Sequence, residues 1–259
     1  MCNSYPSKLI IKTTSKPKKH LSGLLALLIG GFVFANSSTS FADENLDMYD
    51  AKKLIEQGKF KEAKTILLRE EKTITDIGKL CSIYSSMLGI ASISDNKEEG
   101  AQYANLFQKC YKENSTPYIF LGAMTIYFKG EHDKALRIMD KLLDKISNEL
   151  TEEKKPDLHV FEDKNLVSTI YRLKASDLLI RQEPQKVKAT IISFAEKSYE
   201  ATPFGDAEVF LAAIYKFYGD TERSKSIIEK SDGRTTEAHS VDVILKSIKQ
   251  KIDNASVSP

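Results

Sequence analysis

The sequence predicts an all-helical fold made of repeated helical hairpins. Apolar residues recur at spacings of three and four along Tyr118 to Lys145, on both sides of Gly130, which indicates two amphipathic helices joined by a turn. Glycine adopts turn backbone conformations that other residues resist. Ala123 and Ala135 are small and lie twelve positions apart, so they allow the two helices to approach closely. This segment therefore predicts one compact hairpin.

The same frame recurs along the chain. It consists of a small residue, a glycine seven positions later, alanine five after that, and a large apolar residue four further on. It is clear in two segments, at Ala123, Gly130, Ala135 and Met139 and at Ala51, Gly58, Ala63 and Leu67. It is weaker at Gly89, Asn96 and Ala101, has serine for the second alanine at Ala212, Gly219, Ser224 and Ile228, and is degenerate at Ala175, Gln182, Val187 and Ile191. A fixed period of this kind predicts a repeat architecture.

This frame resembles the tetratricopeptide repeat (TPR), and the resemblance covers about residues 45–233. It implies a solenoid of about five helical hairpins, with units near 45–75, 80–114, 117–146, 164–201 and 206–233. The longer spacing before the fourth unit indicates an insertion near 147–163. Residues 235–254 fit an amphipathic helix that caps the last repeat, and 255–259 fit a disordered tail. The resemblance is specific for fold but not for function.

The N-terminus has the three parts of a secretory signal. Five lysines precede an uncharged apolar run from Leu21 to Ala35, and Ser40-Phe41-Ala42 provides small residues for cleavage. We expect cleavage after Ala42, with Ala35 as an alternative. An uncleaved anchor is the other interpretation, although a spanning helix needs roughly 20 apolar residues. The sequence therefore predicts a periplasmic or secreted protein with a signal peptide at 1–42.

Removal of the leader changes the charge balance. The leader holds 5 of the 38 basic residues and none of the 36 acidic ones, so the mature chain has a net charge of 33 − 36 = −3. Nucleic-acid binding depends on clustered Lys and Arg, so this balance argues against a nucleic-acid partner. We expect contact with a membrane only if the signal is retained.

Two cysteines remain in the mature chain. Cys81 falls near the start of the second unit and Cys110 near its end, so an antiparallel hairpin brings them together. An oxidising compartment would allow a disulfide. The alternative is two small thiols buried as apolar groups.

The sequence shows no arrangement typical of an enzyme. The nucleophile, phosphate-binding and zinc motifs of common enzyme classes are missing. The mature chain's histidines, His132, His159 and His239, fall in separate parts of the chain, and His159 with Glu162 would make only two metal ligands. We therefore expect no catalytic residues, no metal and no cofactor.

The resemblance implies a concave groove lined by the first helix of each unit. Carried over to this chain, the groove positions are Met48, Lys52, Ile90, Ile93, Phe120, Met124, Tyr127, Arg172, Leu179, Val209, Lys216 and Phe217. Phe120, Met124 and Tyr127 form a stripe that suits protein contacts but equally suits a helical core. Lys52, Arg172 and Lys216 either pair with acidic groups of a ligand or face water.

The function expected from these features is an exported scaffold that binds a protein or peptide in the cell envelope or secretion pathway. Small-molecule substrates are not indicated. One alternative is a membrane-anchored accessory factor that retains residues 21–35. A less favoured one is an envelope enzyme with its site in the insertion at 147–163.

Overall fold

A computed structural model describes residues 46–94, 96–151 and 157–230, together with 241–242, 244–246, 248–249 and 252–253. All regular secondary structure in these residues is helical. The prediction of an all-α fold is therefore confirmed. The predicted signal peptide at 1–42, residues 152–156 and the predicted tail at 255–259 lie outside the described residues.

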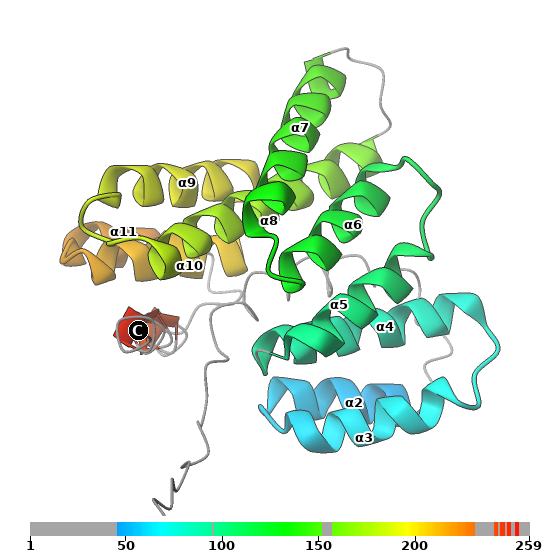
Figure 1. The fold of residues 1–259 in the computed structure, drawn as a ribbon. Coiled ribbons are helices and arrows are strands. Elements are labelled where there is room, and N and C mark those ends of the chain that lie inside the picture. Colours follow the sequence, from blue (N-terminus) through cyan, green and yellow to red (C-terminus); the bar gives the residue numbers. More distant parts are fainter. Residues whose placement is uncertain are drawn as a thin grey trace, which may run out of the picture.

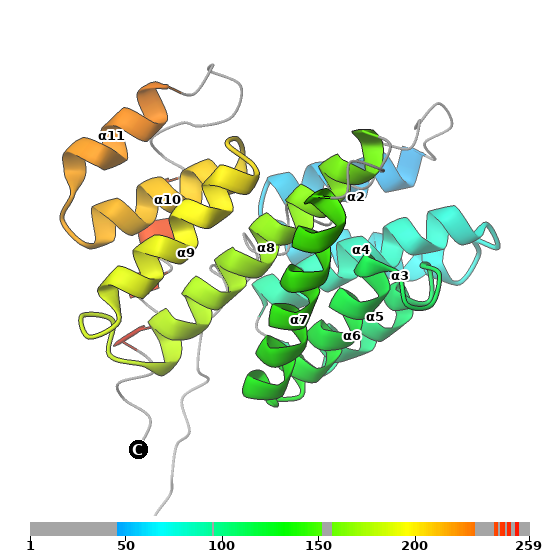
Figure 2. The ribbon, with the colours of Figure 1, turned by 90° about the horizontal axis from the view of Figure 1, so that it is seen from above.

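Within the described part of residues 46–229, ten helices follow one another as five consecutive pairs (Figure 1), which we call hairpins 1 to 5. They are α2 (Leu46–Glu56) with α3 (Phe60–Glu71), α4 (Ile77–Ile93) with α5 (Lys97–Gln108), α6 (Thr116–Phe128) with α7 (His132–Thr151), α8 (Asp157–Arg181) with α9 (Lys188–Ala201), and α10 (Asp206–Phe217) with α11 (Thr221–Glu229). Packing runs mainly between helices that are consecutive in the chain. Figure 2 shows the same order from above.

Three hairpins turn in the same way. Gly58, Gly130 and Gly219 have φ angles of +72°, +87° and +84°, in the left-handed region that favours glycine. Each glycine N–H donates to the carbonyl three residues back, and the next N–H donates to the carbonyl five residues back. This pair of bonds closes the end of the first helix. A Cβ on any of the three glycines would meet no atom within 4 Å, so backbone conformation alone explains the glycine.

The small residues of the frame are buried in both helices of the hairpins. The fourth residue of the second helix is Ala63 in hairpin 1, Ala135 in hairpin 3 and Ser224 in hairpin 5, and these are 0%, 0% and 5% exposed. In the first helices the matching alanines, Ala51, Ala123 and Ala212, are also buried. A bulky side chain at these positions would push the helices apart, because protein interiors are close-packed.

In hairpin 2 the small residue of the second helix lies one position earlier than the sequence frame predicts. Asn96 caps α5, so the residue equivalent to Ala63 is Gly100, and Ala101 is only half-buried. The N–H of Gly100 donates to the carbonyl of Asn96, as Ala63 does to Lys59. A Cβ on Gly100 would lie 2.6 Å from the ring of Phe128 in hairpin 3. The glycine therefore makes room for a neighbouring hairpin.

Hairpin 4 departs from the frame. The second helix starts late, with Val187 as its N-cap, so Ile191 occupies the position that is small in the other hairpins. Ile191 is fully buried. The residues assigned to an insertion fall largely in helix, since α7 extends to Thr151 and α8 begins at Asp157.

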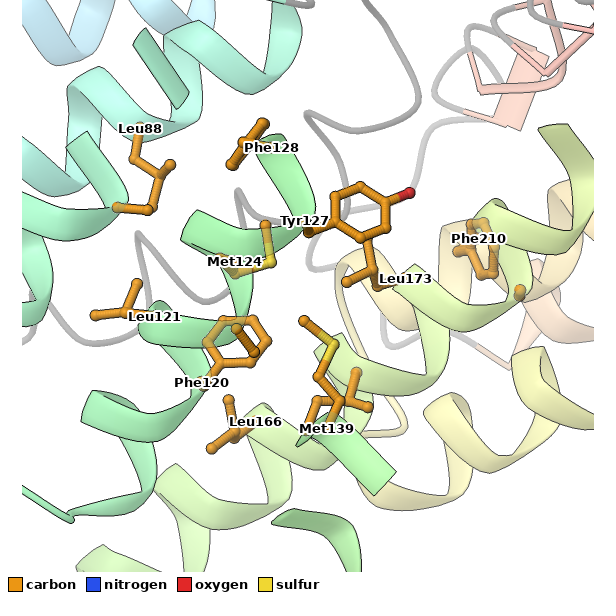
Figure 3. Close-up of a cluster of buried hydrophobic side chains, with 14 of the residues drawn as sticks. Leu88, Phe120, Leu121, Met124, Tyr127, Phe128, Met139, Leu166, Leu173 and Phe210 are labelled. Carbon is orange, nitrogen blue, oxygen red and sulfur yellow. The ribbon is translucent and has the colours of Figure 1, made fainter. Parts of the chain in front are cut away.

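The hairpins share one continuous core. Phe120, Met124 and Tyr127 of α6 lie in it with Met139 of α7 and Leu166 of α8 (Figure 3). The C-terminal residues that are described are also helical, and Val241, Ile244 and Ile248 among them are 3%, 0% and 0% exposed. These side chains are apolar and shielded from water, as predicted for one face of a capping helix.

Candidate functional site

The aromatic and methionine stripe on α6 belongs to the core. Phe120, Met124 and Tyr127 are 1%, 0% and 6% exposed, and Ile90 on α4 is 3% exposed. The prediction that these four side chains line an open groove is therefore wrong, and for Phe120, Met124 and Tyr127 the alternative interpretation as core is correct. The sequence contained a signal for this, because α6 has no charged residue on any face. A helix that is apolar all round is typically buried.

Arg172 is also buried, so its predicted place in the groove is wrong. Its guanidinium lies 3.4 Å from the carboxylate of Asp206 on α10 and donates to the hydroxyl of Thr169 at 3.3 Å. Burial lowers the pKa of Arg172, while Asp206 opposes this shift. A buried charge of this kind requires pairing within the fold. Leu179 and Val209, predicted to follow Arg172 along the groove, are buried as well.

Four predicted groove residues keep contact with solvent. Met48 and Lys52 lie on α2 at one end of the row of hairpins, with Met48 half-buried and Lys52 exposed. Lys216 and Phe217 lie at the end of α10 and are half-buried. Lys216 donates to Asp242 at 2.7 Å. The side chain of Ile93 lies outside the described residues.

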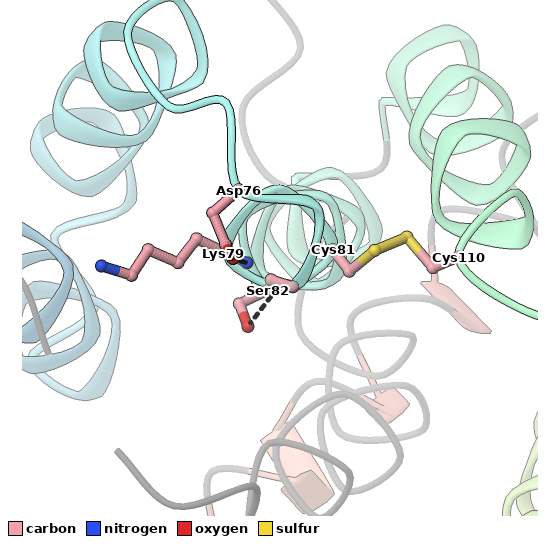
Figure 4. Close-up of a disulfide and its surroundings, with 6 residues drawn as sticks. Asp76, Lys79, Cys81, Ser82 and Cys110 are labelled. Carbon is pink, nitrogen blue, oxygen red and sulfur yellow. Dashed lines mark hydrogen bonds between the residues drawn. A yellow bond between two sulfur atoms is a disulfide. The ribbon is translucent and has the colours of Figure 1, made fainter. Parts of the chain in front are cut away.

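The disulfide prediction agrees with the structure. Cys81 in α4 and Cys110 just after α5 are bonded, with their Cα atoms 5.9 Å apart (Figure 4). The bond closes hairpin 2 at the end opposite its turn. The N-terminus of α4 is further fixed by Asp76, whose carboxylate accepts the N–H of Lys79.

A polar cluster between hairpins 3 and 4 was not predicted. Asp177 of α8 has a side chain only 4% exposed, and its Oδ1 accepts the hydroxyl of Tyr127 at 3.1 Å. The Nδ1 of His132 lies 3.3 Å from the same oxygen, without the alignment of a hydrogen bond. Arg181 donates to Asp177 at 3.2 Å and to Asp133 at 2.8 Å. The sequence signal was an aspartate within an apolar stretch of α8, whose partner Tyr127 lies 50 residues away.

Arg181 also affects the titration of its neighbour. Its hydrogen bond and charge lower the pKa of Asp133, which is exposed. The pKa of Arg181 is raised in turn, mainly by Asp133. The pair is therefore ionised over the ordinary pH range.

The described residues do not assemble a recognisable reaction centre. Within them no group of three or more His, Cys, Asp or Glu side chains is placed to hold a metal ion. His132 contacts Asp177, while His239 and the side chain of His159 lie outside the described residues. In the part of the chain described by the structure, the helices lack the length and apolar character needed to cross a membrane.

Comparison with models of protein families, with curated proteins and with solved structures finds no match to this chain. The structure therefore defines the protein only as an all-helical protein whose neighbouring helices pack in pairs.

Proposed function

We propose that the chain is an exported, non-catalytic scaffold of the TPR type that binds a protein or peptide in the cell envelope or secretion pathway. The observation that supports this best is the recurring turn at Gly58, Gly130 and Gly219, with the same two hydrogen bonds each time. Buried small residues at matching positions accompany each turn. Repeats of this kind build extended surfaces, and their common use is to hold other proteins.

The disulfide supports the exported location. Such bonds persist in oxidising compartments and are rare in the cytosol. Cys81 and Cys110 are bonded here, and both follow the predicted signal peptide in the sequence. The scaffold therefore works after export, on the periplasmic or extracellular side.

Because the predicted groove residues on α6 are buried, a partner would have to bind at other positions. Since Phe120, Met124 and Tyr127 are buried, a partner reaches the accessible positions, Lys52 on α2 and Lys216 on α10. Polar substitutions in the buried stripe would damage the fold and would not report on binding. Charge reversal at the two lysines removes no buried apolar side chain, and at Lys216 it also replaces the ion pair with Asp242 by two like charges.

The test is a cross-linking pull-down of the tagged, exported protein, with partners identified by mass spectrometry. The variant is Lys52→Glu with Lys216→Glu, and the matched control is Lys186→Glu, an exposed lysine paired with Glu183 in its own loop. We expect one envelope protein to be enriched by the native chain and the control and lost from the double variant. If no protein is enriched, the scaffold function is refuted, and if the double variant keeps the partner, this surface is refuted.

The mature N-terminus distinguishes the free from the anchored form. We expect N-terminal sequencing of the exported protein to begin at Asp43. A chain that retains residues 21–35 would instead be an anchored accessory factor.

A further inference from the structure

Hairpins 3 and 4 are joined by an unusual set of side chains. We call Tyr127, His132, Asp133, Asp177 and Arg181 the Asp177 cluster. Tyr127 comes from α6, His132 and Asp133 from the first turn of α7, and the other two from the C-terminal half of α8. The contacts to both oxygens of Asp177 and the Arg181–Asp133 pair thus connect three helices.

The backbone contributes little at this junction. Helices α4 to α7 pack closely on one another in order, and α8 packs closely on α9, but α7 packs on α8 as sparsely as α3 packs on α4. Figures 1 and 2 show α7 crossing α8, whereas α8 and α9 lie alongside each other. The connection therefore depends on side chains that reach from hairpin 3 to α8.

Those side chains are of two kinds. The apolar ones gather where Phe120 and Met139 of hairpin 3 approach Leu166 and Leu173 of α8 (Figure 3). The burial energy of apolar contact is largely non-directional. The polar ones are directional, and a second ion pair joins Lys174 of α8 to Asp140 of α7.

Asp177 is the centre of the polar set. Its carboxylate is almost completely buried, so it needs its hydrogen-bond donors. A buried network of this kind fixes one arrangement when it is satisfied and becomes unfavourable when one member is removed. The arrangement fixed here is the orientation of α8 relative to α6 and α7.

We propose that the junction of hairpins 3 and 4 is a hinge locked by Asp177. Two rigid parts then meet at this junction, hairpins 2 and 3 on one side and hairpins 4 and 5 on the other. Each part keeps its own close helix pairs when the lock is removed. Release of the lock changes the angle between the parts and exposes Tyr127 and Leu173, which are 6% and 1% exposed in the locked form. This hinge does not depend on the proposed binding function.

The experiment measures distances across the hinge by double electron–electron resonance on the oxidised mature chain, residues 43–259. One spin-label pair, Glu98→Cys with Glu229→Cys, spans the hinge, and a second pair, Glu98→Cys with Lys141→Cys, lies within hairpins 2 and 3. All three positions are exposed. The unlocking variants are Asp177→Asn and, as a milder change that retains the ring, Tyr127→Phe.

A matched control is Arg223→Gln, which breaks an exposed ion pair with Asp220 far from the hinge. We expect both unlocking variants to broaden the distance distribution across the hinge and to leave the second pair unchanged, with helix content preserved in circular dichroism. Hydrogen exchange should rise at Tyr127 and Leu173 in the same variants. The control should behave as the native chain does.

Two results would overturn the proposal. One is a folded Tyr127→Phe variant whose distances match the native chain across the hinge. The other is a loss of helix in both parts together when Asp177→Asn is introduced, because rigid parts must survive release of the lock.

Discussion

Loss of the Cys81–Cys110 disulfide should lower the free energy of unfolding by about 3–4 kcal/mol. The two cysteines are 29 residues apart in sequence. In the chain-entropy model, closing a loop of this size removes about 12 cal/mol/K from the unfolded chain, or about 3.6 kcal/mol near 25 °C. The effect is expected in the unfolded state, since the bond closes a hairpin that helix packing also holds together. The perturbation is the double variant Cys81→Ser with Cys110→Ser.

Urea unfolding followed by circular dichroism measures the change. We expect the double variant to keep its helix content without urea and to unfold at a lower urea concentration. The dependence of the free energy on urea should also become steeper, because an uncrosslinked chain exposes more surface when it unfolds. Both cysteines are half-buried, so serine leaves no large cavity in the core.

Chemical reduction of the native chain provides the control. It should give the same loss as the double variant, without changing any side-chain volume. Equal urea midpoints for the oxidised and reduced chains would show that the loop-closure reasoning is incorrect for this fold. A loss in the double variant alone would assign the effect to packing of the cysteines instead.

Three further predictions concern the turns and the buried rings. Gly130→Ala should lower the free energy of unfolding by about 1 kcal/mol, because the φ of +87° at this position strains any residue with a Cβ. An unchanged midpoint in urea unfolding would disprove this. Gly100→Ala should lower the free energy of unfolding by about 1–3 kcal/mol, since the new Cβ would lie 2.6 Å from the ring of Phe128. Adding Phe128→Leu to the same chain should recover part of that loss. If the losses of the two substitutions are instead additive, the clash is not their cause. Burial raises the pKa of Tyr103 to about 12, so above pH 10 the unfolded chain loses this proton first, and stability should fall between pH 10 and about 12. Tyr103→Phe should remove part of this alkaline loss, and an unchanged pH profile in that variant would contradict the assignment.

The turn frame is readable from the sequence because it depends on local backbone conformation. The spacing of small residues predicts turns at Gly58 and Gly130, and both glycines have positive φ. The same spacing predicts helix contacts at Ala63 and Ala135, and both alanines are fully buried. The error of one residue at Gly100 arises because the frame fixes spacing, while the start of α5 is set by the Asn96 cap.

The groove residues could not be assigned in the same way. A stripe such as Phe120, Met124 and Tyr127 has the same periodicity whether it faces a partner or another helix. Its burial depends on α8, which comes from a separate hairpin.

The sequence alone determined the helical class of this protein, the positions of its glycine turns and the proximity of Cys81 and Cys110, since these depend on short-range spacing. The tertiary structure decided that the α6 stripe is core, that Arg172 pairs with Asp206, and that Asp177 gathers Tyr127, His132 and Arg181 around it. Tyr127 and Asp177 are 50 residues apart, and only the packing of α8 across hairpin 3 brings them together. Such contacts arise from the angle between helices, which the spacing of residues within one helix does not specify.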